Sequence, residues 1–478
     1  MKRLGLLLLL VAAARAGDDL APALRAGLVE LHVESQDWDS REPWKKRPER
    51  RSTGRGFVVE PGVVLTPADV VADQLMIEVS VANSARRYPA RLKHIDKGLG
   101  LALVEITDEE LRAALAPLPI GEPARLDQEC DIWQLGQENL LERYDGRVVA
   151  VSANGPQLAL RVKTTCADNG DGQVAIRDGK VVGLLNSTIR GRQEGTLIGV
   201  ETIRRYLEDF ADGTYHGAPA AGLWYHTLLR DDLRAYYGVP DDKHGIAISR
   251  VMKGRTGDGV LREGDVVLAV DGYDLDDEGR FVHEVHGRLA ASWLFQGRRY
   301  AGDKVKATVL RDGNVQEVEL ELRSVPASEQ RVPDGPPNGR PQYLVVGGMV
   351  ILELAADQPI SRSTGGVILR RYRDRANWDQ PDERRRIVFI DHVLSDAANK
   401  GYEDMQHMPI ERVNGVPIRE IADVAKAMET PVRGFHVFEL EGTEVDVVLP
   451  APQLAEIDAR IAQTYKVTRS RYLVGDEE

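Results

Sequence analysis

Short apolar stretches that alternate with polar residues dominate the first part of the chain. Between residues 57 and 200 they follow one another, separated by Gly, Pro, Asn or Asp. Period-two alternation bounded by turn residues is typical of half-buried β-strands, so the pattern predicts an all-β barrel or sandwich. The expected strands are 57–59, 63–66, 76–81, 90–95, 101–106, 131–136, 147–152, 157–162, 173–176, 180–186 and 196–200.

Helical spacing of apolar residues is found at both ends of this region. The pattern predicts a short amphipathic helix over Leu20–Val33 and a closing helix over Glu201–Phe210. Further along, an Asp-Gly dipeptide at 312–313 lies between two alternating runs, which is a strong signal for a β-hairpin.

Two segments rich in Gly and Pro interrupt the chain, at 211–219 and 325–341, and 478 residues are too many for one core. We therefore expect three domains, at 17–212, 218–325 and 342–465. A linker at 326–341 separates the last two, and a C-terminal tail follows at 466–478. Residues 1–16 resemble a secretory signal peptide, with Lys2 and Arg3, an apolar run and Ala-Arg-Ala before Gly17.

The apolar run of this signal is shorter than the roughly 20 residues that span a bilayer, and no other stretch approaches that length. The sequence thus predicts an exported protein, periplasmic or extracellular, with no stable membrane span. An uncleaved N-terminal anchor is the alternative. The formal charge of −13 argues against nucleic acid or anionic lipid as the main partner.

The chain has two cysteines, Cys130 and Cys166, which excludes a disulfide-rich scaffold. In an exported protein they are able to pair, but spacing alone does not decide whether they do. A Cys nucleophile is not expected, because neither residue has an evident base beside it.

Three segments of the first domain carry a more specific pattern: Gly54–Val71, Asp96–Val104 and Asp168–Leu184. The first contains Gly-Arg-Gly before a strand and ends in Thr-Pro-Ala-Asp-Val-Val. The second reads Asp-Lys-Gly-Leu-Gly-Leu-Ala-Leu-Val, and the third begins Asp-Asn-Gly-Asp-Gly-Gln-Val before a strand–turn–strand. In this order they resemble the HtrA/Deg family of exported trypsin-like serine proteases with PDZ domains. The resemblance implies a mainly β fold: a chymotrypsin-like double β-barrel followed by two PDZ-like α+β domains.

The same resemblance implies that the catalytic positions are substituted. The family's His, Asp and Ser fall on Asp69, Gly100 and Gly170. The Ser–His–Asp mechanism needs a hydroxyl nucleophile, an imidazole base and an orienting carboxylate, so the chain is expected not to be an active protease. Asp171, where the family has Gly, adds a negative charge close to the expected oxyanion pocket. An endopeptidase with displaced catalytic residues remains an alternative, as does a regulatory partner of an active HtrA paralogue.

The second domain resembles a PDZ domain. Gly222, Leu223, Trp224 and Tyr225 fall on the family's carboxylate-binding loop and peptide-pairing strand, although Trp224 stands where a small residue is usual. The resemblance implies a groove helix over Arg280–Ala290, with Val282, His283 and His286 facing the peptide. These two histidines lack an evident third ligand, so neither a metal nor another cofactor is expected.

The third domain is similar to a PDZ domain over shorter segments. They are the apolar strand Leu344–Val350 with a Gly-Gly approach loop, the segments 387–394 and 411–414, and a helix over 418–428. The function that follows is binding of extended peptides or unfolded proteins by the PDZ modules. The resemblance also implies two partners as options, a second copy of the chain, since family members commonly assemble, or an HtrA paralogue.

Overall fold

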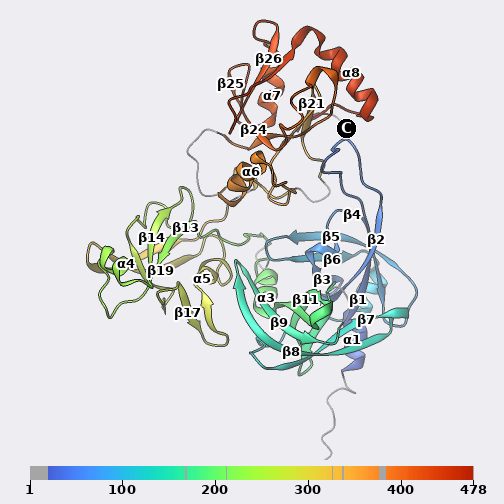
Figure 1. The fold of residues 1–478 in the computed structure, drawn as a ribbon. Helices are drawn as coiled ribbons and strands as arrows, with labels where there is room; N and C mark the ends of the chain where they lie inside the picture. The colour runs from blue at the N-terminus through green and yellow to red at the C-terminus, as the bar shows by residue number, and fades with distance from the viewer. Residues whose placement is uncertain are drawn as a thin grey trace, which may run out of the picture. The chain divides into compact units, whose positions relative to one another are not determined.

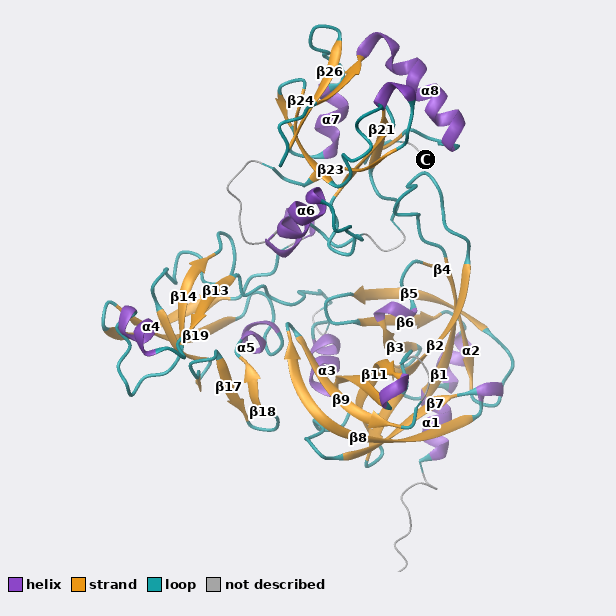
Figure 2. Ribbon diagram, in the orientation of Figure 1, coloured by secondary structure: helices purple, strands orange, loops and turns teal. Residues whose placement is uncertain are grey.

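The computed structural model describes residues 20–166, 170–210, 213–325, 327–335, 339–375 and 384–476, so the signal-like segment lies outside the described residues. The internal contacts of the chain divide it into two units. Figures 1 and 2 show the helices and strands of the described residues. The first comprises the chain up to Val33, Ser52–Val71 and Met76–Glu208. The second comprises Glu34–Arg51, Ala72–Leu75 and the chain from Asp209 onward.

The first unit begins with a closed six-stranded barrel. Its strands, in barrel order, are β1 (Leu28–Ser35), β2 (Arg50–Glu60), β3 (Val63–Pro67), β6 (Leu101–Ile106), β5 (Tyr88–Asp96) and β4 (Gln74–Val81). Alternate residues of these strands point inward, and a buried cluster that includes Val58, Val64, Val79 and Val104 fills the interior. Valine suits this position because its branched side chain packs well on a pleated surface.

A second closed barrel follows. Its strands, in order, are β10 (Val174–Arg177), β11 (Lys180–Ile189), β12 (Glu194–Gly199), β9 (Gln157–Thr164), β8 (Leu141–Asn154) and β7 (Glu129–Leu135). Cys130 and Cys166 are both free thiols in its buried core. Helix α3 (Val200–Glu208) ends the unit. The double β-barrel that the sequence predicts is therefore confirmed, and each expected strand from 57 to 200 overlaps an observed one.

The predicted helix at Leu20–Val33 is only half correct. Helix α1 (Ala21–Gly27) ends at Gly27, and the next residues form β1. Their burial alternates from residue to residue, with Leu31 and Val33 facing the barrel core. A period of two fits a strand, so tertiary packing overrides the helical spacing here.

The middle module, residues 218–325, contains a sheet in the order β13-β14-β15-β19-β20. The bounds are β13 (Leu223–Thr227), β14 (Ile246–Val251), β15 (Val266–Val270), β19 (Lys304–Arg311) and β20 (Asn314–Glu321). β16 (Tyr273–Asp274) pairs with β15, and β17 (Arg280–His283) with β18 (Gly287–Ala290). Two short helices, α4 (Asp231–Tyr236) and α5 (Ser292–Gln296), complete it. The predicted Asp-Gly hairpin is observed between β19 and β20.

The third module contains an eight-stranded sheet in the order β27-β26-β24-β23-β22-β21-β28. The bounds are β27 (Val447–Pro450), β26 (Phe435–Leu440), β24 (Met408–Val413), β23 (Val388–Val393), β22 (Met349–Glu353), β21 (Tyr343–Val346) and β28 (Arg471–Tyr472), with β25 (Val416–Pro417) beside β24. Its helices are α6 (Thr364–Arg375), α7 (Ile421–Ala427) and α8 (Leu454–Tyr465).

The Gly-Gly pair of the third module is not an approach loop. Gly347 and Gly348 form the two-residue turn between β21 and β22, with φ of +57° and +89°. Such a turn needs positive φ at both positions, which glycine adopts without strain. The predicted single strand over Leu344–Val350 is therefore a hairpin.

Candidate functional site

The loops that carry Asp69, Gly100 and Gly170 lie beside one another in the first unit. Asp69 is exposed in a 3-10 turn directly after β3, and the preceding Ala68 N donates to Gly100 O at 2.9 Å. On the other side, a Cβ placed on Gly172 would lie 2.9 Å from Pro67 Cδ. Three segments that are far apart in the sequence thus meet at one place. Asp168 and Asn169 of the third motif lie outside the described residues.

Gly170 occupies a position that no side chain fits. Its φ is +82°, in the left-handed region that favours glycine. A Cβ built there would lie 2.4 Å from both N and Cα of Ser187, a residue of β11. Backbone atoms of a paired strand do not move aside as a flexible side chain does. The loop is therefore packed against β11 in a way that leaves no space for a hydroxymethyl group.

The negative charge of Asp171 has a cationic neighbour. Arg55 Nη1 lies 3.9 Å from Asp171 Oδ2, and Arg55 N donates to Asp171 O at 2.6 Å. The Asp171 carboxylate is thus accompanied by a guanidinium that is itself mostly buried. Arg55 lies between the glycines of the first motif, and Asp171 follows Gly170 in the third. The two residues face each other.

A histidine and a serine of the first barrel are in contact, and their arrangement is not that of a catalytic pair. His32 Nε2 lies 2.9 Å from Ser80 Oγ, and Glu30 Oε2 lies 3.4 Å from the same nitrogen. In a triad the serine and the carboxylate engage opposite ring nitrogens. Ser80 is only 1% exposed, and its hydroxyl donates to Asn139 Oδ1 at 3.0 Å. Burial lowers the pKa of His32 and raises that of Glu30.

The third module holds a second serine–histidine contact. Ser361 Oγ lies 3.0 Å from His407 Nδ1, and Asp391 Oδ1 lies 3.7 Å from His407 Nε2. Serine and carboxylate do face opposite nitrogens here, but 3.7 Å is too long for a hydrogen bond. Asp391 is held more closely by His392 Nδ1, at 2.9 Å. Burial lowers the pKa of His407. Ser363 Oγ, 2.9 Å from Ser361 Oγ, accepts from Gly366 N in the first turn of α6, so the serines also serve that helix.

His94, the other barrel histidine, has a structural partner. Its Nδ1 lies 2.9 Å from Oη of Tyr206, a fully buried residue of α3. Burial raises the pKa of Tyr206, so the phenol stays protonated. The contact ties β5 to α3.

The peptide-pairing residues proposed for the middle module lie on an outermost strand. β13 is the last strand of its sheet, and among the described residues β14 is the strand that pairs with it. Trp224 and Tyr225 are 38% and 45% exposed on β13. Gly222 has φ of +62°, and its carbonyl accepts from Met252 N at 3.0 Å. An edge strand of this kind offers backbone groups to an added strand.

The groove helix predicted over Arg280–Ala290 is wrong: these residues form the β17–β18 hairpin. Phe281 and Leu289 are buried partners across it, and Gly287 supplies a positive φ at the turn. His283 is buried, and its ring stacks on that of His286 with centroids 5.0 Å apart. Val282 is 70% exposed on the opposite face. The three residues therefore do not form one peptide-facing surface.

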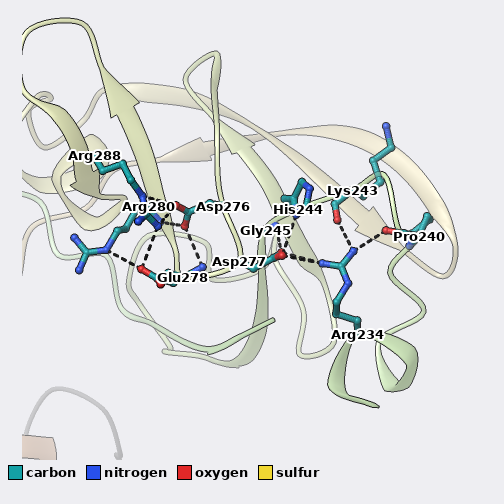
Figure 3. Close-up of polar contacts among 10 residues, drawn as sticks. All are labelled: Arg234, Pro240, Lys243, His244, Gly245, Asp276, Asp277, Glu278, Arg280 and Arg288. Atoms are coloured by element: carbon teal, nitrogen blue, oxygen red, sulfur yellow. Dashed lines mark hydrogen bonds and ion pairs between the residues drawn. The ribbon is translucent and has the colours of Figure 1, made fainter. Parts of the chain in front are cut away.

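A polar cluster around Asp277, shown in Figure 3, was not predicted from the sequence. Arg234 Nη1 donates to both carboxylate oxygens at 3.0 Å, and His244 Nδ1 lies 2.9 Å from Oδ2. The Asp277 carbonyl accepts from Leu228 N, just after β13. The cluster thus fixes the end of β13 to α4. The run Asp276–Glu278 was a visible acidic signal, but nothing in its spacing named Arg234 as the partner.

In the described part of the chain, no group of three or more His, Cys, Asp or Glu side chains is arranged to hold a metal ion. Within the same residue ranges, no helix has the length and apolar character needed to cross a bilayer.

Known families match two parts of the chain. A trypsin-like peptidase domain model matches residues 54–184, and a PDZ domain model matches residues 332–472. The first match contains all three loops described above, and the second contains the sheet of the third module.

Similar full-length proteins come from plants and bacteria. Chloroplastic protease Do-like 2 of Arabidopsis thaliana is 27% identical over 419 residues, which cover 85% of this chain and 68% of the relative. Mitochondrial protease Do-like 4 of the same plant is 26% identical over 435 residues, with coverage of 89% and 81%. A probable periplasmic DegP-like serine endoprotease of Marinomonas sp. (strain MWYL1) is 27% identical over 294 residues, covering 58% of each chain.

A solved structure has the same fold. A variant of the HtrA-type protease AlgW with a decapeptide matches with a TM-score of 0.50 and 17% identity, covering 64% of this chain and 98% of that one. The two closed barrels, the PDZ match and the Do-like relatives agree with one another. Together these findings support an HtrA/Deg family member, with a trypsin-like protease fold and a PDZ domain.

Proposed function

We propose that this chain is a non-catalytic HtrA/Deg protein that binds extended peptides or unfolded protein segments without cleaving them. The packing of Gly170 carries the proposal. Glycine supplies no nucleophile, and Ser187 occupies the space that a serine side chain needs. Asp69 supplies no imidazole to accept a proton, and Gly100 supplies no carboxylate to orient one, so none of the three positions performs its step of the mechanism.

Electrostatics at the same place support the proposal. Hydrolysis through an acyl intermediate needs donors aimed at a developing oxyanion. Here Asp171 and Asp69 bring two carboxylates to this region, and Arg55 lies beside Asp171. A negative charge near a developing oxyanion raises the barrier, because like charges repel strongly in a site shielded from water.

An endopeptidase with displaced catalytic residues is the second candidate, and the serine–histidine contacts favour it over other enzyme classes. Ser80 is buried and shares one imidazole nitrogen with Glu30, which leaves no base for it. Ser361 has the better arrangement, with His407 between it and Asp391. Its hydroxyl already contacts the Ser363 hydroxyl, which caps α6, and this is a sufficient structural role.

Activity-based labelling separates these two candidates. The full chain is incubated with fluorescein-labelled unfolded casein, and in parallel with a fluorophosphonate, beside an active HtrA-type protease. We expect no casein fragments and no covalent label. Stoichiometric labelling that disappears in Ser361→Ala or Ser80→Ala would establish a displaced nucleophile and overturn the proposal.

The binding half of the proposal rests on the edge strand β13 and on the PDZ match of the third module. The AlgW variant with a decapeptide shows that a protein of this fold takes a peptide. We expect fluorescein-labelled unfolded casein to bind the full chain in an anisotropy titration. Trp224→Asp, on β13, should weaken binding at least tenfold, and Tyr236→Asp, at an aromatic on α4 that is 79% exposed, should not. Equal affinities for both variants would remove β13 from the site.

Export and pairing with an active HtrA paralogue complete the proposal. The basic residues Lys2 and Arg3 and the apolar run after them support secretion, and cleavage after Ala16 is checked by mass spectrometry of the N-terminus. Co-purification with an active HtrA protease from its own source would favour the regulatory role over a free-standing binder.

A further inference from the structure

The segment that joins β1 to β2 belongs to the second unit, although both strands are part of the first barrel. β1 ends at Ser35 and β2 begins at Arg50, so residues 36–49 lie between them. By its contacts the range Glu34–Arg51 falls in the second unit, whereas most of β1 and β2 falls in the first. We call residues 36–49 the strap. The chain continues from each of its ends into a barrel strand.

A tryptophan of the strap is part of the third module's core. Trp44 is 4% exposed and belongs to the buried cluster that contains Tyr343 of β21 and Phe389 of β23. Its ring centroid lies 6.3 Å from that of Tyr343. The Trp44 carbonyl accepts from Thr468 Oγ1 at 3.4 Å. Every other member of this cluster of described residues lies within 332–472, the range that the PDZ domain model matches. The strap therefore completes a core that otherwise comes from the module itself.

A row of alternating cations and aromatic rings joins the strap to the module a second time. The Arg340 guanidinium lies over the rings of Trp38 in the strap and Tyr472 in β28, at 4.4 and 4.6 Å from their centroids. Lys46 Nζ of the strap lies 5.3 Å from the Trp38 centroid. Arg340 Nη2 also donates to Tyr343 Oη at 2.8 Å, which fixes the guanidinium. A cation within about 6 Å of a ring centroid is attracted to the ring, so these contacts hold the strap in place.

Hydrogen bonds within the strap hold it in one shape. Asp39 N donates to Lys45 O at 2.9 Å, and Arg47 N donates to Asp37 O at 2.9 Å, so the two arms of the strap pair with each other. At its turn, Asp39 Oδ1 accepts from Arg41 N at 2.8 Å. A segment that is already ordered loses little conformational freedom when it packs against another surface. The strap is therefore well suited to dock as a preformed hairpin.

The turn of the strap lies near the polar cluster of Ser361, His407 and Asp391. Burial is the largest cause that lowers the pKa of His407, and the positive charge of Arg41 lowers it further. Because water and salt screen distant charges, a charge with this effect lies close to the imidazole. The strap thus meets the third module at a third place.

We propose that the strap is an intramolecular clamp, in which residues 36–49 dock on the third module of the same chain and keep it attached to the barrel. The partner of this surface of the module is a named segment of the chain, with Trp44 as its anchor. The same chain supplies it, because strap and module fall in one unit of a single chain. A module held by its linker and by the strap has fewer accessible positions than a module on a linker alone. The third module is therefore not a freely moving PDZ domain.

The environment of the Trp44 indole indicates which substitutions test this inference. Among the described residues, no group accepts a hydrogen bond from Trp44 Nε1. The anchor therefore acts through its apolar surface, and phenylalanine supplies much of that surface without a buried N–H group. Serine removes the ring altogether. Glu49, which is exposed on the same strap, provides the matched control.

A cut in the linker of the full chain tests the inference. A recognition sequence for a site-specific protease is inserted between Ser324 and Val325, ahead of Val332, which is buried in the module's own core. After cleavage, we expect the third module to co-elute with the barrel fragment on size exclusion at micromolar concentration. Trp44→Ser should release the module, because loss of a buried tryptophan side chain weakens an association about a hundredfold or more. Trp44→Phe and Glu49→Ser should retain it.

Release of the third module from the cleaved, otherwise unmodified chain would overturn the inference. Retention by Trp44→Ser, with its near-ultraviolet circular dichroism unchanged, would also overturn it. If Trp44→Ser does not fold, competition on the cleaved unmodified chain decides. A peptide copying residues 34–51, in large molar excess, should release the module, and the same peptide with Ser in place of its tryptophan at position 44 should not. Retention against the unaltered peptide would show that other surfaces hold the module, contrary to the inference.

Light scattering on the uncleaved chain checks that the strap docks within one chain. The unmodified chain and Trp44→Ser should have the same molar mass. A lower mass for Trp44→Ser would show that the strap docks on a second copy and would contradict the inference. None of these measurements uses casein, so the clamp and the proposed peptide binding through β13 can fail separately.

Discussion

Placing a methyl group at Gly170 tests the claim that the nucleophile position has been closed by packing. Two costs add in Gly170→Ala. A left-handed conformation costs a residue with a Cβ about 1–2 kcal/mol, and the φ here is +82°. The new Cβ also lies 2.4 Å from N and Cα of Ser187, and overpacking of this kind costs about 1–3 kcal/mol. We expect the free energy of unfolding of the first unit to fall by about 2–5 kcal/mol.

Gly155→Ala is the matched control. Gly155 also has a positive φ, +57°, but no atom lies within 4 Å of the Cβ position. It should therefore lose only the conformational part, about 1–2 kcal/mol. Urea unfolding followed by tryptophan fluorescence measures both variants, and about 2–4 °C of Tm accompanies each kcal/mol in a domain of this size. Equal losses in the two variants would refute the argument that Ser187 blocks the site.

The same geometry predicts the outcome of rebuilding the triad. Asp69→His, Gly100→Asp and Gly170→Ser together restore the family's residues at the three positions. Gly100 also has a positive φ, +69°, and Gly170→Ser meets the Ser187 backbone as alanine does. We expect a strongly destabilised chain that neither cleaves casein nor reacts with a fluorophosphonate. Measurable turnover by the triple variant would show that the loop relaxes to admit the nucleophile.

Three further predictions concern other parts of the chain. Burial raises the pKa of Asp458 to about 6 in the folded chain. The carboxyl therefore holds its proton more tightly in the folded chain than in the unfolded chain. The free energy of unfolding is then greatest below about pH 4 and falls as pH rises through 6. A pKa shift of about two units corresponds to about 3 kcal/mol, which partial exposure of the carboxyl reduces to roughly 1–2 kcal/mol. Asp458→Asn should remove that part of the pH dependence, measured by urea unfolding between pH 4.5 and 7.5. Parallel curves of unfolding free energy against pH for the two proteins would contradict the prediction. Cys130 and Cys166 should resist a thiol reagent at pH 8 in the native chain, because both are buried and burial raises the pKa of Cys130 to about 11. In guanidinium without reductant, two thiols per chain should react. No reaction in guanidinium would indicate a disulfide. Asp277→Ala leaves Arg234 without its carboxylate partner and should lower the free energy of unfolding of the middle module by about 2–3 kcal/mol. His244→Ala, at an exposed position, should lower it by less than about 1 kcal/mol. A larger loss in His244→Ala than in Asp277→Ala would mean that Arg234 is not the main partner of Asp277.

The barrels were predictable because their signal is both local and repeated. Strands such as β1 and β9 alternate buried and more exposed residues, and turn residues mark the strand ends. The loops of Asp69, Gly100 and Gly170 were selected through the order of three motifs, and the structure brings these loops together. The sequence did not reveal the contact of Gly170 with Ser187, because that contact depends on how β11 curves beside the loop.

The hairpin at residues 280–290 shows why other elements were missed. Val282, His283 and His286 fit a helical face by spacing, whereas the structure buries Phe281 and His283, two residues apart. A segment this short fits both the helical period of about 3.6 residues and the strand period of about two. Its packing against the rest of the module therefore decides which structure forms. Trp293 of α5 packs against the rings of Phe281 and His283, so the hairpin gains a buried aromatic partner that the sequence pattern does not show.

The two serine–histidine contacts show which facts about catalysis only the structure reveals. Ser80 lies 48 residues from His32 and Ser361 lies 46 residues from His407, distances at which sequence spacing carries no information about contact. Proximity alone does not make a nucleophile, however. Ser80 does not fit the role of a nucleophile, because Glu30 lies against the same nitrogen of His32 and because Ser80 is buried. Neither fact can be inferred from the residue types. Catalytic competence therefore depends on which ring nitrogen each partner meets and on whether a substrate carbonyl can approach. Gly170 does not serve as the nucleophile for two reasons. It has no side chain, and the backbone of Ser187 in β11 occupies the space that a side chain would need.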